Sequence, residues 1–197
     1  MKKNLLLGAA LSLFSLVAAA APVNIDFNNF GNGVAVASTQ GVTFALAGGP
    51  VISGAPTTTM ASYVGLASHN LLTNSATAGS YPTASILRAT FDGLASDLSF
   101  QFFNAGGISS FYTTYDIAGH VLETGSLVAS ANSLLTFTTH VDGVHSIEFN
   151  NSTAGRSSWW FGLGSLTANV NNVPEPTSIA LVGLALFGLG AARRRKA

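Results

Sequence analysis

Apolar and polar residues alternate with a period of two through much of the middle of the chain. Leu98, Phe100 and Phe102, for example, are separated by Ser99 and Gln101. Such alternation is typical of an antiparallel strand with one face buried and the other in water. Because no long stretch between the two ends shows capped helical periodicity, the pattern predicts an all-β body.

Glycine-rich turn signals separate the predicted strands at intervals of roughly 8 to 12 residues, which is typical of a β-sandwich. We expect a jelly-roll-like antiparallel β-sandwich, flanked by an N-terminal signal helix and a C-terminal single transmembrane helix. Residues 54–84 are rich in Ser, Thr, Ala and Gly, so we expect long loops with one short strand there. The predicted strands cover residues 23–27, 41–46, 50–53, 85–91, 96–103, 109–117, 120–127, 133–139, 144–149 and 158–170, the last divided in two around Gly162 to Gly164.

Two histidines flank the Asp142-Gly143 pair and could be read as metal ligands. A two-residue hairpin would place His140 opposite His145, but it would also put the apolar residues of the two strands on opposite faces. A bulge or a crossover between sheets fits the apolar pattern better. Since either one separates the histidines, we interpret them as loop residues and not as a metal site.

The N-terminus has the three parts of a signal peptide. Lys2 and Lys3 form a positive region, residues 5–17 are apolar, and the small residues 18–21 suit signal peptidase. We expect cleavage after Ala20, because proline at position 22 fits poorly directly after a cut. The alternative is an uncleaved membrane anchor, although the apolar run is short for a span.

The C-terminal segment, residues 173–197, also has three parts. The tripeptide Pro174, Glu175 and Pro176 should be extended. An uncharged transmembrane helix is expected over 177–192, with a length of roughly 24 Å against about 30 Å of hydrocarbon. A basic tail over 193–197 supplies the cytoplasmic stop and places the body outside the membrane, through Arg193, Arg194, Arg195 and Lys196. A permanent single-pass anchor remains the alternative.

This three-part segment resembles the PEP-CTERM sorting domain. The resemblance implies export across the inner membrane of a Gram-negative bacterium, transient anchoring, and removal of the tail by the membrane enzyme exosortase. It also implies a final place at the cell surface or in the extracellular polysaccharide matrix. The recognition element carried over to this chain is Pro174, Glu175 and Pro176.

The predicted exported domain, residues 21–172, carries a second and more diffuse resemblance. The stretches Asp26-Phe27, Gly41-Val42-Thr43-Phe44, Phe91-Asp92-Gly93 and Tyr115-Asp116-Ile117 resemble exported domains that accompany such tails. These domains are similar to lectin-type or carbohydrate-binding-module jelly rolls. The resemblance implies a fold more than a function.

Charge is distributed unevenly between the ends and the body. Six of the eight Lys and Arg residues lie at the termini. Between residues 22 and 173 only Arg88 and Arg156 oppose seven acids, so that stretch has a formal charge of −5. An acidic body argues against nucleic-acid binding and against attachment to anionic lipid. The absence of cysteine from the sequence excludes thiol chemistry and disulfides.

Candidate binding residues outnumber catalytic signals, because none of the common nucleophile, zinc or phosphate motifs occurs in the sequence. The adjacent Trp159 and Trp160 should face opposite ways on a strand, so one of them could stack on a sugar with Arg156 nearby. Asp26, Asn28 and Asn29, together with Asn32, could bind calcium, or could form Asx turns with their own backbone. No other cofactor is expected.

We therefore expect a non-catalytic cell-surface or matrix protein associated with exopolysaccharide and biofilm, processed by signal peptidase and exosortase. A module that binds extracellular glycan directly is the second hypothesis. A glycan hydrolase is a distant third, since it would need two carboxylates about 5–9 Å apart in one cleft.

Overall fold

The computed structural model describes residues 21–47, 55–63, 66–78, 86–104, 110–128, 133–151 and 161–171. All of them belong to one compact unit, Ala20–Asn171. The predicted signal peptide, the Pro-Glu-Pro tripeptide, the helix expected at 177–192 and the basic tail lie outside the described residues. None of the described segments forms a helix with the length and apolarity needed to cross a membrane.

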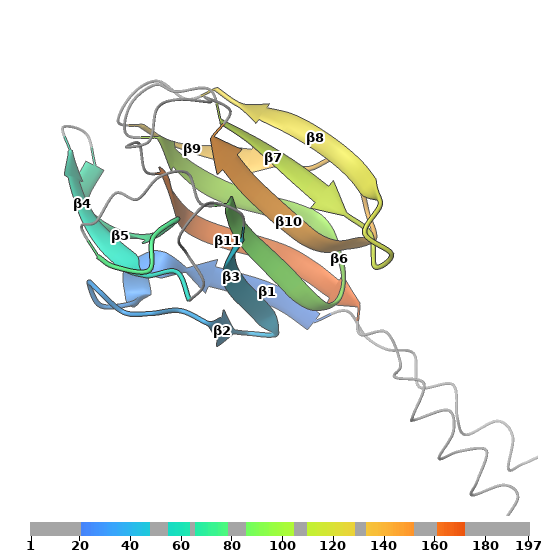
Figure 1. The fold of residues 1–197 in the computed structure, drawn as a ribbon, viewed down its shortest axis with the longest axis horizontal. Coiled ribbons are helices and arrows are strands. Elements are labelled where there is room, and N and C mark those ends of the chain that lie inside the picture. The colour runs from blue at the N-terminus through green and yellow to red at the C-terminus, as the bar shows by residue number, and fades with distance from the viewer. Residues whose placement is uncertain are drawn as a thin grey trace, which may run out of the picture. The chain divides into compact units, whose positions relative to one another are not determined.

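The described residues are almost entirely β-strand, with one short 3-10 helix, and all strand pairs are antiparallel (Figure 1). The elements are β1 (Ala21–Asp26), η1 (Phe27–Asn29), β2 (Ser38–Thr39), β3 (Val42–Ala47), β4 (Thr58–Tyr63), β5 (Leu66–Thr73), β6 (Ile86–Asn104), β7 (Ser110–Tyr115), β8 (Val121–Leu127), β9 (Ser133–Thr138), β10 (Val144–Asn151) and β11 (Phe161–Asn171).

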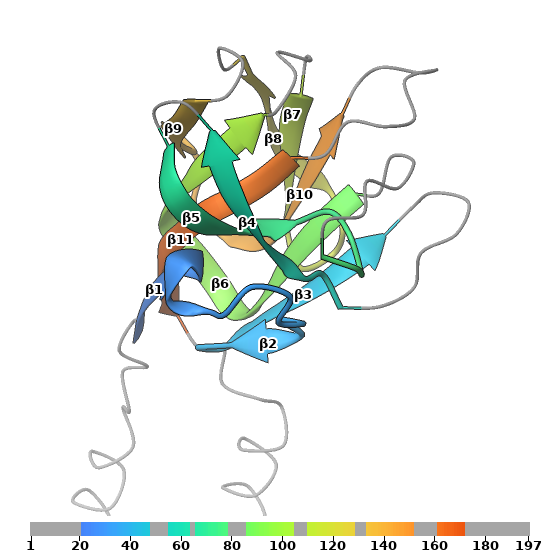
Figure 2. The ribbon, with the colours of Figure 1, turned by 90° about the vertical axis from the view of Figure 1, so that its left-hand side faces the viewer.

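The long strand β6 joins two layers of a sandwich. Its first part, up to Phe91, pairs with β3 on one side and β10 on the other. Its second part, from Leu94 onward, pairs with β11 and β9. The first layer therefore runs β3-β6-β10-β7-β8, and the second runs β9-β6-β11-β5-β4, with β1 also beside β11. Strand β5 lies next to β11 and is paired on its other side with β4 (Figure 2).

Two local features accompany the turn of β6 from one layer into the other. Gly93 lies directly against the end of β11, where a Cβ atom would sit 2.3 Å from the backbone oxygen of Asn171. Asp97 adopts a left-handed φ of 50°, and its carboxylate accepts a 2.9 Å hydrogen bond from Asn169 Nδ2. The register between β6 and β11 shifts at this point, as expected for a β-bulge that bends a strand.

The core lies between the two layers and is dominated by phenylalanine. Phe100 from the second part of β6 meets Phe149 from β10 edge to face, with ring centroids 4.9 Å apart. Phe102 packs against Phe161 at 5.3 Å. These rings are buried, and burial of such side chains typically contributes about 1.5–3 kcal/mol each. The alternation of Leu98, Phe100 and Phe102 thus points into the sandwich, as predicted.

The observed strands agree with most of the predicted ranges, and two differences have physical causes. Residues 85–91 and 96–103 belong to the single strand β6, because the Gly93 bend keeps the chain extended through the corner. The range 158–170 holds one strand from Phe161 onward with no division, because the Gly162 to Gly164 stretch is accommodated by a register shift against β6, between Leu163 and Ser165. The range 50–53 lies outside the described residues.

The prediction of loops with one short strand over 54–84 was wrong, because β4 and β5 both lie there. These strands bury the threonines Thr58, Thr59 and Thr73 as well as Leu71 and Leu72. The hydroxyl of Thr57 donates to the carbonyl of Ser75, and that of Thr73 donates to the carbonyl of Thr57, each at 2.9 Å. A buried hydroxyl that finds a backbone acceptor avoids the cost of desolvation, so a polar sequence can form interior strand.

The strands on either side of Asp142-Gly143 lie in different layers, because β9 pairs with β6 in the second layer while β10 pairs with β6 and β7 in the first. The crossover expected from the apolar pattern is therefore present, and the two-residue hairpin is not. His140 is exposed, and its backbone N–H donates to Glu123 Oε2 at 2.9 Å. Among the described segments, no three His, Cys, Asp or Glu residues are grouped so that they could hold a metal ion.

Candidate functional site

The outward face of the first layer is hollowed where β6, β10 and the β7–β8 turn meet. Leu87, Ala89, Ile147 and Phe149 point into the core, so the residues that alternate with them point outward. The hollow has a volume of about 380 Å³. Its lining comprises Arg88, Tyr115, Asp116, Ile117, Gly119, His145, Ser146 and Glu148.

Strand register brings the central residues of the hollow together. Arg88 on β6 lies directly opposite Glu148 on β10. Tyr115 on β7 is paired with Ser146, two residues before Glu148, which places it diagonally across from the carboxylate. Opposite charges facing each other across a strand pair stabilise the sheet modestly.

The Glu148 carboxylate is held by two neighbours. Arg88 donates to its Oε1 atom from both Nε, at 2.8 Å, and Nη2. The hydroxyl of Tyr115 donates to Oε2 at 2.9 Å. Glu148 is 13% exposed and Arg88 46% exposed, so the pair lies at the boundary between protein and solvent. Burial, followed by the hydrogen bond to Glu148, raises the pKa of Tyr115 and keeps its hydroxyl a donor.

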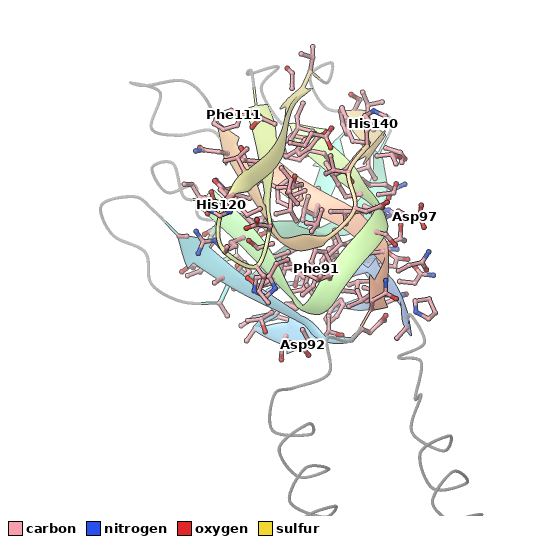
Figure 3. The ribbon with its side chains drawn as sticks, turned by 90° about the vertical axis from the view of Figure 1, so that its right-hand side faces the viewer. Phe91, Asp92, Asp97, Phe111, His120 and His140 are labelled. Atoms are coloured by element: carbon pink, nitrogen blue, oxygen red, sulfur yellow. The ribbon has the colours of Figure 1, made fainter. Side chains whose placement is uncertain are left out.

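Asp116 organises the turn at one rim of the hollow. Its Oδ1 atom accepts hydrogen bonds from the backbone N–H groups of Ala118 and His120, both at 2.8 Å. Its Oδ2 atom lies 3.0 Å from Nδ1 of His120. The backbone hydrogen bond from His120 is the main reason that the pKa of Asp116 is lowered. The turn leaves Ile117 65% exposed. Figure 3 shows that His120 in this turn lies far from His140.

His145 contributes a polar atom that has no partner. It enters the hollow at the bulge where the register of β10 against β6 shifts. Its Nδ1 atom is buried and makes no hydrogen bond within the part of the chain that the structure describes. In the Nε2–H tautomer that nitrogen is an acceptor.

This arrangement is suited to hydrogen bonding more than to acid–base catalysis. The hollow combines carboxylate acceptors, guanidinium and phenol donors, an imidazole nitrogen and the apolar surface of Ile117. A glycosidase pair needs one carboxylic acid with a raised pKa, whereas the pKa of Asp116 is lowered. Glu148, the other acid in the hollow, is paired with a cation.

The predicted calcium residues lie in and around η1 and direct their oxygens to the backbone. Asp26 Oδ1 accepts from the N–H of Asn28 at 2.9 Å and caps η1. Asn28 Oδ1 accepts from the N–H of Asn70, and Asn32 Oδ1 from that of Met60. Only Asp26 forms the Asx turn that was the alternative to calcium, since Asn28 and Asn32 bond the distant strands β5 and β4. Asn29 is exposed beside them. The calcium site stays a prediction.

The other predicted site residues, Arg156, Trp159 and Trp160, lie outside the described residues, as do Pro174, Glu175 and Pro176. The sequence did not predict Arg88, Tyr115 or Glu148 as site residues, and His145 was considered only as a metal ligand. A weak signal was present, because Glu148 is a charge between two apolar residues of a strand and Arg88 is one of two cations in the body. Only the pairing of strands shows that they meet.

The solved structures that are similar to this chain include two mutants of CBM29-2, from work on ligand recognition by family 29 carbohydrate binding modules. The first has a TM-score of 0.45 and 12% identity, and covers 80% of this chain and 99% of the other. The second has a TM-score of 0.42 and 12% identity, and covers 79% and 99%. Comparison with curated protein sequences finds no match.

The C-terminal segment matches a family model, in agreement with the resemblance seen in the sequence. The model is that of the PEP-CTERM protein-sorting motif, and it matches residues 172–196. This range contains the tripeptide Pro174, Glu175 and Pro176 and all four basic residues of the tail. The chain therefore carries a PEP-CTERM protein-sorting motif at its C-terminal end.

Proposed function

We propose that this protein is a non-catalytic cell-surface or extracellular-matrix protein of a Gram-negative bacterium, delivered by its sorting motif. The observation that carries the proposal is the PEP-CTERM match at residues 172–196. Signal peptidase removes residues 1–20 and exosortase removes the tail, so the β-sandwich body is released among extracellular polysaccharide. The body becomes acidic once both basic ends are gone, which suits a soluble matrix component.

Mass spectrometry of the surface form tests this fate. The mature protein should begin at Ala21 and lack residues 193–197. A Glu175→Ala variant should retain the tail, because it breaks the motif, whereas Ser126→Ala on the exposed part of β8 should be processed normally. Recovery of intact Arg193 to Lys196 from mature wild-type protein would contradict removal and support a permanent anchor.

Direct binding of a glycan by the body is the second candidate function. The observation that favours it is the hollow around Glu148, which combines paired donors and acceptors with an exposed apolar side chain. Sugars are commonly held by planar hydrogen-bonding groups together with aromatic or apolar surface. Arg156 and the two tryptophans remain proposed as a further glycan-binding surface.

A glycan array probed with the full-length protein in detergent micelles tests this second function. Wild-type protein should bind at least one glycan class, and binding should weaken in a Glu148→Gln variant. A folded protein that binds no glycan would reject direct binding and leave the sorting proposal intact.

A further inference from the structure

We propose that the hollow selects neutral, hydroxyl-rich sugars and discriminates against anionic ones such as uronates and sulfated sugars. This inference rests on the proposed glycan binding and specifies its ligand class. The charged side chains that line the hollow around Glu148 decide which ligands it accepts.

The electrostatics of the described body oppose an anionic ligand. Arg88 is the only Lys or Arg among the described ranges, whereas all seven acids of the body lie within them. The charge of Arg88 is already matched by Glu148, with which it forms an ion pair. An incoming carboxylate would lie close to the Glu148 carboxylate and would also approach Asp116 at the rim. Like charges brought together in a partly desolvated site repel each other strongly.

Hydroxyl groups suit the same atoms well. A sugar hydroxyl both donates and accepts, so it can donate to Glu148 while it accepts from Arg88. Arg88 has five N–H donors and uses two of them on Glu148, which leaves three for a ligand. The Oε1 atom of Glu148 already accepts twice from Arg88, whereas Oε2 accepts only from Tyr115 and keeps a further lone-pair site. A neutral diol can therefore join the pair without breaking it.

Size and apolar surface restrict the ligand further. A volume of about 380 Å³ lies at the small end of the range for ligand pockets, so the hollow suits a short stretch of a polymer. Ile117, 65% exposed, presents apolar surface beside Tyr115, where the C–H face of a sugar ring could rest.

The test compares neutral and acidic polysaccharides, for example mannan and dextran against alginate and polygalacturonate. Binding of the full-length protein in neutral detergent is measured at low and high salt. Wild-type protein should prefer a neutral polymer by about tenfold or more, which corresponds to one charge-assisted hydrogen bond. Its affinity for the neutral polymer should change little with salt, because no net charge is neutralised on binding.

The Glu148→Gln variant should reverse this preference. It removes an acceptor and releases the charge of Arg88, so affinity for the neutral polymer should fall about tenfold while affinity for the acidic polymer rises. Asp142→Asn makes the same charge change at an exposed position outside the hollow and should alter neither affinity. Ile117→Ala, at an exposed site where folding is not at risk, should weaken neutral binding about threefold.

The possible outcomes distinguish selectivity for neutral sugars from glycan binding itself. The inference is overturned if the wild type prefers an acidic polymer. It is also overturned if neither Glu148→Gln nor Ile117→Ala changes binding of the neutral polymer. Either result leaves glycan binding itself in place. Absence of binding to every polymer would overturn glycan binding itself. Loss of neutral binding with a gain for the acidic polymer in Glu148→Gln would support the assignment, because a purely structural defect would lower both.

Discussion

Tyr112 and Gly125 lie directly opposite each other on β7 and β8, and a Cβ atom on Gly125 would come within 2.2 Å of the tyrosine ring. The glycine therefore leaves the space in which the ring lies. From there Tyr112 reaches the core edge to face with Phe100, at a centroid separation of 5.5 Å. Its hydroxyl donates to Glu123 at 2.7 Å.

Replacing Gly125 with alanine should destabilise the protein by about 1–3 kcal/mol, because the added methyl group forces the ring of Tyr112 out of its position. Urea unfolding of the purified protein measures this change. Gly31→Ala is the matched control, since a Cβ there makes only an ordinary 3.4 Å contact with Val34. Equal stability of the two variants would show that the Tyr112 ring can be accommodated elsewhere.

Tyr112 should also make stability fall with alkaline pH. Burial first, and then the hydrogen bond and charge of Glu123, raise its pKa far above the ordinary value of 10.0. Because the folded-state pKa is the higher one, this contribution is complete below pH 10 and is lost as pH rises toward the folded-state value.

Between pH 10 and 12, wild-type protein should therefore lose about 1.4 kcal/mol per pH unit more than a Tyr112→Phe variant. Urea unfolding at several pH values in this range gives the two slopes. Parallel slopes would mean that Tyr112 ionises in the folded protein as easily as in the unfolded chain.

Gly93→Ala should be strongly destabilising for a different reason. The new Cβ atom would meet the backbone oxygen of Asn171 at 2.3 Å and Cγ1 of Val170 at 3.0 Å. Backbone atoms cannot rotate away as a side chain can, so β6 and β11 would have to separate at the corner between the layers. We expect a loss of about 3 kcal/mol or more and a lower Tm, measured by thermal unfolding. A Tm equal to that of the wild type would contradict the close approach.

The two tryptophans should respond differently to replacement by alanine. Adjacent residues of a strand face opposite ways, so we expect one of Trp159→Ala and Trp160→Ala to destabilise the body and the other to leave its stability unchanged. The variant of unchanged stability should weaken glycan binding by about tenfold if that ring stacks on sugar. Thermal unfolding and the glycan array together measure both effects. If both folded variants bind glycan as well as the wild type does, neither tryptophan takes part and the glycan binds only at the hollow.

Several features could be predicted because they depend on neighbouring residues alone. The period of two in Leu98, Phe100 and Phe102 reports which side of one strand is apolar, and the structure buries that side. The apolar mismatch around Asp142-Gly143 similarly predicted that β9 and β10 would not form a simple hairpin. The sequence predicted only one short strand where β4 and β5 lie, because the buried threonines there look polar until their backbone acceptors are in place.

The sequence by itself determined the sorting segment and the all-β class, since charge clusters, apolar length and alternation are properties of contiguous residues. Only the tertiary structure decided that β6 turns at Gly93 and serves both layers. It also decided that Arg88, Tyr115 and Glu148, carried by three separate strands, meet at one hollow. The physical reason is strand register: a shift of one residue would turn each of these side chains to the other face, and register is set by the packing of the whole core.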